Sequence, residues 1–172
     1  MIRLIISDID GTLVKEGSTE INPEYMEVIR QLADQGVTFA AASGRHSSSI
    51  DAVFHEVRNR IFYLSDNGSC IQKYGTPCHE LRLNTEDLKG YLQEALEGGD
   101  CQRELGVNRE ETVVFGDNFN DMSMLACGDR SYASVLSAPE VKQAARYEVA
   151  SYEEDGVLQV LKDILQEVAH EK

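Results

Sequence analysis

The chain is poor in positive charge: 16 lysines and arginines stand against 30 aspartates and glutamates, and the formal net charge is −14. Nucleic acids and anionic membranes are bound through clustered basic side chains, so this balance argues against both as partners. Long apolar runs are also missing. No stretch resembles a secretory leader, and none is long enough to span a bilayer. We therefore expect a cytoplasmic protein.

Cysteine is scarce as well, with four residues at irregular spacing and no CxxC pair: Cys70, Cys78, Cys101 and Cys127. This pattern argues against a metal or disulfide framework, so we expect reduced thiols. The length of 172 residues, with 42% hydrophobic and 27% charged residues, is typical of a globular protein with one core. We expect a single domain over residues 1–172.

The segment LIISDIDGT at residues 4–12 is the motif around which the chain is organised. Its apolar run, bounded by a glycine turn, predicts a buried strand with Asp8 and Asp10 on one face at its carboxyl end. Two carboxylates about 5 Å apart repel by roughly 3 kcal/mol at an effective dielectric constant of 20. A hard divalent cation such as Mg²⁺ would convert this repulsion into a binding site. A solvated pair of aspartates at a turn is the alternative.

Strands and helices are predicted to alternate along most of the chain. Further strands are expected at residues 37–42, 60–64, 113–117, 131–135 and 147–151, and helices at 23–35, 47–57, 121–127, 139–146 and from 156 onward. This order predicts an α/β fold, in which right-handed crossovers build a mostly parallel, doubly wound sheet between two helical layers. Residues 70–105 are less regular, with a short strand at 80–83 and an amphipathic helix at 85–96.

A second acidic motif, GDNFND at residues 116–121, places Asp117 and Asp121 between a predicted strand and a predicted helix. Carboxylates at the ends of two strands can converge on one cation, and the amides of a helix start favour a nearby anion. Ser43 and Gly44 follow another strand, where backbone N–H groups can approach a phosphate. Taken alone, each motif could be a simple helix N-cap. Their shared position at strand ends favours a metal and phosphate site.

Together the segments IISDIDGTLV, AAASGR, LSDNGS, VVFGDNFNDMSML and EVKQAARYEVASYEEDGV resemble the Cof-type, sugar-phosphatase-like branch of the haloacid dehalogenase (HAD) superfamily. The resemblance implies a Rossmann-like core and a Mg²⁺-dependent phosphatase that hydrolyses small phosphate monoesters through a phospho-aspartate. Asp8 would be the nucleophile, and Asp10 would protonate the leaving alcohol and then activate water. The remaining roles implied are support of the loop geometry by Thr12, phosphate contacts by Ser43, Gly44 and Asn120, and Mg²⁺ ligation by Asp8, the Asp10 carbonyl and Asp117, with Asp121 nearby.

Residues 70–100 depart from this family, whose members insert a whole cap domain at that point. Because only one strand and one helix are predicted here, we interpret the segment as a cap remnant within the core. The family's motif lysine has no clear counterpart. Lys89 is the candidate, although we favour reading it as an exposed helix lysine. The apolar stripe of the 85–96 helix predicts a homodimer contact.

There are two alternatives to a phosphatase. The first is a non-catalytic module that binds Mg²⁺ and phosphate and arose by loss of the cap. The second is a receiver-type signalling domain, which fits poorly because no phosphorylatable aspartate is apparent on a middle strand.

Overall fold

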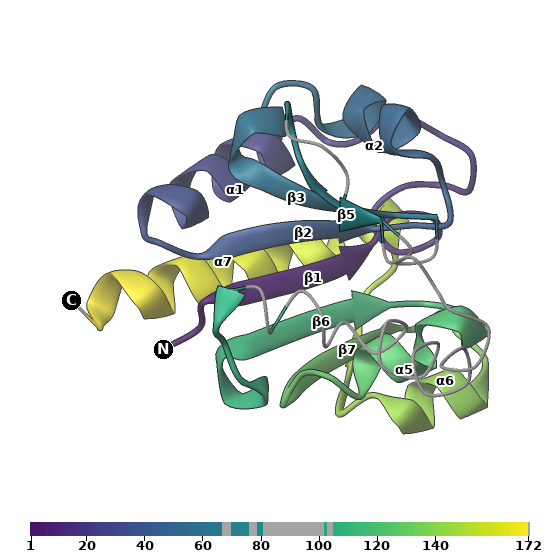
Figure 1. Cartoon of the computed structure of the whole chain (residues 1–172). Helices are drawn as coiled ribbons and strands as arrows, with labels where there is room; N and C mark the ends of the chain where they lie inside the picture. The colour runs from purple at the N-terminus through teal and green to yellow at the C-terminus, as the bar shows by residue number, and fades with distance from the viewer. Residues whose placement is uncertain (67–69, 76–78, 81–101, 103–104, 172) are drawn as a thin grey trace, which may run out of the picture.

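The computed structural model describes residues 1–66, 70–75, 79–80, 102 and 105–171. In this part of the chain, eight strands form one sheet (Figure 1). Their order is β5-β4-β3-β2-β1-β6-β7-β8. The strands are β1 (Leu4–Asp8), β2 (Thr38–Ala42), β3 (Ile61–Ser65), β4 (Cys70–Lys73), β5 (His79–Glu80), β6 (Thr112–Gly116), β7 (Arg130–Ser134) and β8 (Tyr147–Val149). The helices are α1 (Glu24–Asp34), α2 (Ser47–Phe54), α5 (Met122–Leu125), α6 (Pro139–Ala144) and α7 (Gly156–His170).

Strand β1 lies in the middle of the sheet and pairs in parallel with β2 on one side and β6 on the other. Its first residue, Leu4, is opposite both Thr38 of β2 and Thr112 of β6, so the three strands run in step. Their carboxyl ends therefore meet at one edge of the sheet. In open parallel sheets this edge is where ligands bind, and here it collects the chain segments that follow Asp8, Ala42 and Gly116.

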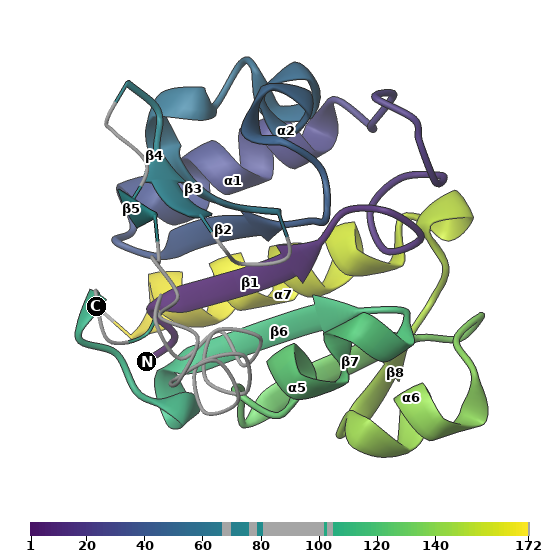
Figure 2. The ribbon, with the colours of Figure 1, turned by 45° about the vertical axis from the view of Figure 1, so that its right-hand side comes forward.

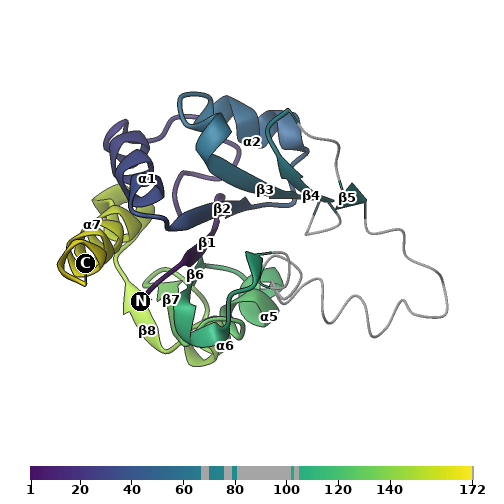
Figure 3. The same cartoon turned by 60° about the vertical axis from the view of Figure 1, so that its left-hand side comes forward.

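Alternation along β1 divides the core between the two faces of the sheet. Ile5 packs in a large cluster with side chains of α1, α2 and α7, whereas Leu4 and Ile6 pack in a second cluster with side chains of α5 and α6. Figure 2 shows α5 and α6 beside β6 and β7, and Figure 3 shows α1 and α7 side by side on the opposite face. The predicted three-layer α/β fold with a mostly parallel sheet is confirmed.

Some details differ from the expectation. Helix α2 ends at Phe54 instead of residue 57, and a short 3₁₀ turn leads from there into β3. Strand β4 was not predicted; it pairs antiparallel with β3 and extends the core sheet. The predicted strand at 80–83 lies largely outside the described residues, and the 85–96 helix entirely so.

The expectation of reduced thiols is wrong for Cys70, which is disulfide-bonded, whereas Cys127 is a buried free thiol. A disulfide depends on two Cβ atoms meeting at about 4 Å, which the spacing of cysteines in a sequence does not report. Among the described residues, none of the helices combines the length and apolar character that a membrane span requires.

Candidate active site

A cavity of about 210 Å³ opens at the carboxyl ends of β1, β2 and β6. Its lining is strongly acidic and includes no cationic side chain among the residues that the structure describes: Asp8, Asp10, Gly11, Glu16, Ser43, Gly44, Asp117, Asn118, Asn120 and Asp121. Both acidic motifs and the Ser-Gly element therefore meet in one place, as the parallel register of the strands requires.

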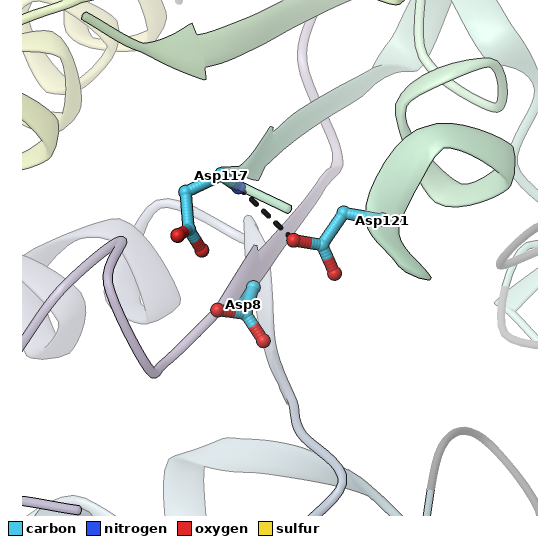
Figure 4. A group of neighbouring side chains, drawn as sticks. All are labelled: Asp8, Asp117 and Asp121. Atoms are coloured by element: carbon cyan, nitrogen blue, oxygen red, sulfur yellow. Dashed lines mark hydrogen bonds between the residues drawn. The ribbon is translucent and has the colours of Figure 1, made fainter. Parts of the chain in front are cut away.

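Three carboxylates form the centre of the cavity wall. Asp8, Asp117 and Asp121 each offer an oxygen, and these oxygens all lie within 4.8 Å of one another (Figure 4). Asp8 is 6% exposed and Asp121 is 4% exposed. Asp121 is fixed by two backbone N–H groups, those of Asp117 and Asn118, which donate to its Oδ2 at 3.0 Å. The turn after β6 thus aims its second carboxylate back toward the end of β1.

Burial and mutual repulsion make full ionisation of this group unfavourable. Burial raises the pKa of Asp8 well above its usual range, and the nearby charges of Asp121 and Asp117 raise it further. Burial also raises the pKa of Asp117, and it raises the pKa of Asp121 to about 6. A compact set of hard oxygen ligands under such repulsion suits a divalent cation such as Mg²⁺. These residues fit a metal.

The segment after β1 passes close beside Asp117. Thr12 is buried, and its hydroxyl donates to Asp117 Oδ1 at 3.0 Å, which orients that carboxylate. Gly11 has φ +80°, and any Cβ at this position would overlap the Asp117 carboxylate. The Gly-Thr pair after the two aspartates is thereby explained, since glycine admits the carboxylate and threonine binds it.

Asp10 belongs to a different set of contacts. Both of its carboxylate oxygens accept hydrogen bonds from Arg45, with Nε at 2.7 Å from Oδ2, and Gly17 N–H donates to Oδ1 at 2.8 Å. Burial alone would raise the pKa of Asp10, but the bonds from Arg45 and Gly17 outweigh it and hold this pKa below its usual range. The expected pairing of Asp8 with Asp10 is thus partial. They line one cavity, but β1 ends at Asp8, so strict alternation does not extend to residue 10.

The comparison with known proteins agrees with this geometry. A protein-family model described as haloacid dehalogenase-like hydrolase matches residues 5–102 and 100–161. The chain belongs to this family.

Curated relatives of this HAD-like hydrolase are named as phosphatases. The chain is 31% identical over 74 residues (43% of the chain, 27% of the relative) to the 5-amino-6-(5-phospho-D-ribitylamino)uracil phosphatase YbjI of Escherichia coli. It is 31% identical over 104 residues (59% and 37%) to the corresponding phosphatase YitU of Bacillus subtilis. A putative bifunctional phosphatase/peptidyl-prolyl cis-trans isomerase of Streptococcus pyogenes is 26% identical over 192 residues (91% and 40%). The chain thus spans roughly a quarter to two fifths of these relatives.

Solved structures share the fold of the HAD-like hydrolase. A protein of Eubacterium rectale superposes with a TM-score of 0.83 at 25% identity, covering 95% of this chain and 99% of the other. A sugar phosphatase of HAD subclass IIB superposes with a TM-score of 0.73 at 20% identity, covering 94% and 98%.

The predicted site residues of the HAD-like hydrolase are brought together in part. Ser43, Gly44 and Asn120 line the cavity beside the acidic group. Thr12, expected to support the loop geometry, donates to Asp117 and is not among the described lining residues, so its role in the reaction stays a prediction. Lys89 lies outside the described residues.

Sequence reasoning missed four residues of this site: Gly11, Glu16 and Asn118, which line the cavity, and Arg45, which binds Asp10. Arg45 directly follows Ser43 and Gly44 in the segment AAASGR, but nothing in the local sequence connects it with Asp10, 35 positions away. Glu16 lies between β1 and α1, at a position where no site residue was expected. Asn118 is part of the second acidic motif, where its side chain accepts a hydrogen bond from Phe119 N–H at 2.8 Å.

Proposed function

We propose that this HAD-like hydrolase is a Mg²⁺-dependent phosphatase of small phosphate monoesters, of the sugar-phosphate type, that works through a phospho-aspartate. The observation that carries the proposal is the group of three carboxylates within 4.8 Å of one another, in the same cavity as Ser43, Gly44 and Asn120. Family membership and the phosphatase names of the relatives support the same reaction class.

Asp8, Asp117 and Asp121 are the side chains that would hold the metal, with the Asp10 carbonyl as a further ligand. When bound, Mg²⁺ would neutralise part of the acidic cavity, so that an anionic phosphate ester can approach an anionic nucleophile. Thr12 would keep the Asp117 carboxylate in its ligating orientation through the 3.0 Å hydrogen bond. Ser43 and Gly44, on the β2 side of the cavity, would contact the phosphoryl oxygens.

In the proposed reaction, an oxygen of the Asp8 carboxylate attacks phosphorus, and the bond from phosphorus to the ester oxygen breaks. The negative phosphoryl group bound beside Asp10 would raise its pKa against the contacts from Arg45 and Gly17, so that Asp10 carries a proton at this step. Asp10 gives this proton to the departing oxygen, which leaves as the alcohol. Water then attacks the acyl phosphate on Asp8, and Asp10 takes the proton of that water. Inorganic phosphate leaves, and both aspartates return to their starting states.

The first test is hydrolysis of p-nitrophenyl phosphate with Mg²⁺, with EDTA, and by the Asp8→Asn variant. Asp163→Asn, a change at an exposed position on α7, is the matched control. We expect turnover by the wild type and the control with Mg²⁺, and none with EDTA or after Asp8→Asn. Turnover that persists in Asp8→Asn would contradict a phospho-aspartate.

The non-catalytic reading is favoured by one observation, the lack of a cationic side chain among the described residues that line the cavity. Removing one preorganised donor typically costs 10²- to 10³-fold in rate, so this lack alone predicts a slow enzyme sooner than an inactive one. A folded protein that binds Mg²⁺ and beryllofluoride without any turnover would favour the binding module. The cytoplasmic location, the cap remnant and the homodimer through residues 85–96 stay predictions.

A further inference from the structure

Arg45 is held firmly at the point where three strand ends meet. Its backbone N–H donates to Ser43 Oγ at 3.1 Å, just after β2. Its carbonyl accepts a hydrogen bond at 3.1 Å from the N–H of Asp66, the residue that follows β3. With the backbone anchored on both sides, the side chain extends toward the segment that follows β1, where it meets Asp10.

Arg45 binds Asp10 through a bidentate contact. Nε donates to Oδ2 at 2.7 Å and Nη2 donates to Oδ1, so both carboxylate oxygens are engaged by one planar guanidinium. The two side chains are only 14% and 26% exposed. A paired contact of this kind fixes the plane of a carboxylate, whereas a lysine ammonium would act as a point charge and leave that plane free.

The loop after β1 closes the arrangement from the other side. Arg45 Nη2 also donates to the Ser18 carbonyl at 2.8 Å, and Gly17 N–H donates to Asp10 Oδ1 at 2.8 Å. The guanidinium therefore binds the carboxylate and the loop that covers it at the same time. Asp10 lines the cavity, whereas Arg45 is not among the described lining residues. The Arg45 side chain therefore acts on bound substrate through its contacts, of which the two hydrogen bonds to Asp10 are the ones that reach a carboxylate of the cavity.

We infer that Arg45 is the positioning residue of the proposed reaction: it fixes the direction in which Asp10 presents its carboxyl group to the leaving oxygen. The inference rests on the proposed function. Its consequence is selective. Esters of unactivated alcohols need a proton from Asp10 as the bond breaks, whereas p-nitrophenolate departs readily without one. Loss of Arg45 should therefore impair hydrolysis of an alkyl phosphate far more than that of p-nitrophenyl phosphate.

The test compares kcat/KM for glycerol phosphate and p-nitrophenyl phosphate in the wild type, Arg45→Ala and Arg45→Lys. This parameter covers the steps up to departure of the alcohol, so later hydrolysis of the acyl phosphate does not enter it. Arg60→Ala is the matched control. Arg60 directly precedes β3, at the end of this strand away from the cavity, and forms an exposed ion pair with Asp34. Thermal unfolding of each variant, and the double variant Asp10→Asn/Arg45→Ala, complete the set.

We expect Arg45→Ala to lower kcat/KM for glycerol phosphate by roughly 10- to 100-fold more than for p-nitrophenyl phosphate. Arg45→Lys should restore little of this ratio, and Arg60→Ala should leave it unchanged. On the Asp10→Asn background, Arg45→Ala should have no further effect on the ratio. An equal loss for both esters, or full rescue by Arg45→Lys, would overturn the inference while the proposed function stands. No turnover of either ester by the wild type would overturn both.

Discussion

The buried group formed by Asp8, Asp117 and Asp121 predicts an unusual pH dependence of folding stability in the absence of metal. Each of these carboxyl groups has a raised pKa in the folded protein, so between pH 4 and 6 the folded state binds more protons than the unfolded state. Stability must then fall as the pH rises. The loss begins near the unfolded pKa of 3.8 and, for Asp121, is complete above about 6. For Asp8, which is raised well above its usual value, the loss extends further.

The size of this effect follows from the pKa of Asp121. A change from 3.8 to about 6 corresponds to about 3 kcal/mol at 1.36 kcal/mol per pKa unit. Coulomb repulsion is of the same order, since two charges 4.8 Å apart repel by roughly 3 kcal/mol at an effective dielectric constant of 20. Between pH 5 and pH 8 only the upper part of this change remains, about one pKa unit or ~1.4 kcal/mol, which for a chain of this size corresponds to a shift of about 3–6 °C in the melting temperature.

The assay is thermal unfolding followed by circular dichroism at pH 5 and pH 8, in EDTA and in excess Mg²⁺. In EDTA we expect a lower melting temperature at pH 8 for the wild type, and a smaller decrease for Asp121→Asn, which has no charge to bury at that position. Asp163→Asn, at an exposed position on α7, should behave like the wild type. Mg²⁺ should raise the melting temperature more at pH 8 than at pH 5, because protons compete with the metal.

Two results would refute this reasoning. One is a melting temperature in EDTA that rises or stays constant from pH 5 to pH 8. The other is an Asp121→Asn variant with the same pH dependence as the wild type, which would place the responsible groups elsewhere.

Two further predictions concern the packing around this site and beneath it. Gly11→Ala should weaken Mg²⁺ binding by roughly 10- to 100-fold in a calorimetric titration, because the new Cβ would displace Asp117. Gly36→Ala is the control, since Gly36 has φ +87° with nothing within 4 Å, and equal affinities of the two variants would contradict the argument. Tyr25→Phe should lower the free energy of unfolding in urea by about 1–3 kcal/mol and leave Mg²⁺ affinity unchanged, because the buried tyrosine hydroxyl accepts a backbone N–H of α7 at 3.1 Å. A Tyr25→Phe variant of wild-type stability would show that this N–H is satisfied in another way.

The central strands were predictable because each is buried on both faces and therefore consists of a short apolar run. The runs at β1, β2 and β6 carry this signal, and glycine or polar residues mark where each one ends. The parallel order then brings the carboxyl ends of these strands together, so the sequence alone predicts that both acidic motifs meet. Strand β4, with the sequence CIQK, has one buried residue and no such run. Its place in the sheet depends on pairing with β3.

Contacts between side chains were predictable only where the backbone dictated them. The register of β1 and β6 brings Asp8 near Asp117, but the bond from Thr12 to Asp117 spans 105 positions and depends on the path of the loop. The same holds for Asp10. Its two hydrogen bonds from Arg45 arise because β1 ends two residues earlier, which frees the carboxylate to turn away from Asp8. The hydrophobic pattern of the sequence does not indicate which side chains will form hydrogen bonds with one another.

The central position of β1 also fixes the order in which the site can be completed during synthesis. Its partner β2 is about thirty residues away along the chain, whereas β6 is about a hundred residues away. A nascent chain can pair β1 with β2, and β2 with β3, while the opposite edge of β1 is still open, and an open apolar strand edge is prone to wrong pairing. Asp8 is present from the start, but its partner carboxylates arrive only with β6. The repulsion among the three aspartates therefore opposes the pairing of β6 with β1, and a bound metal ion would relieve it.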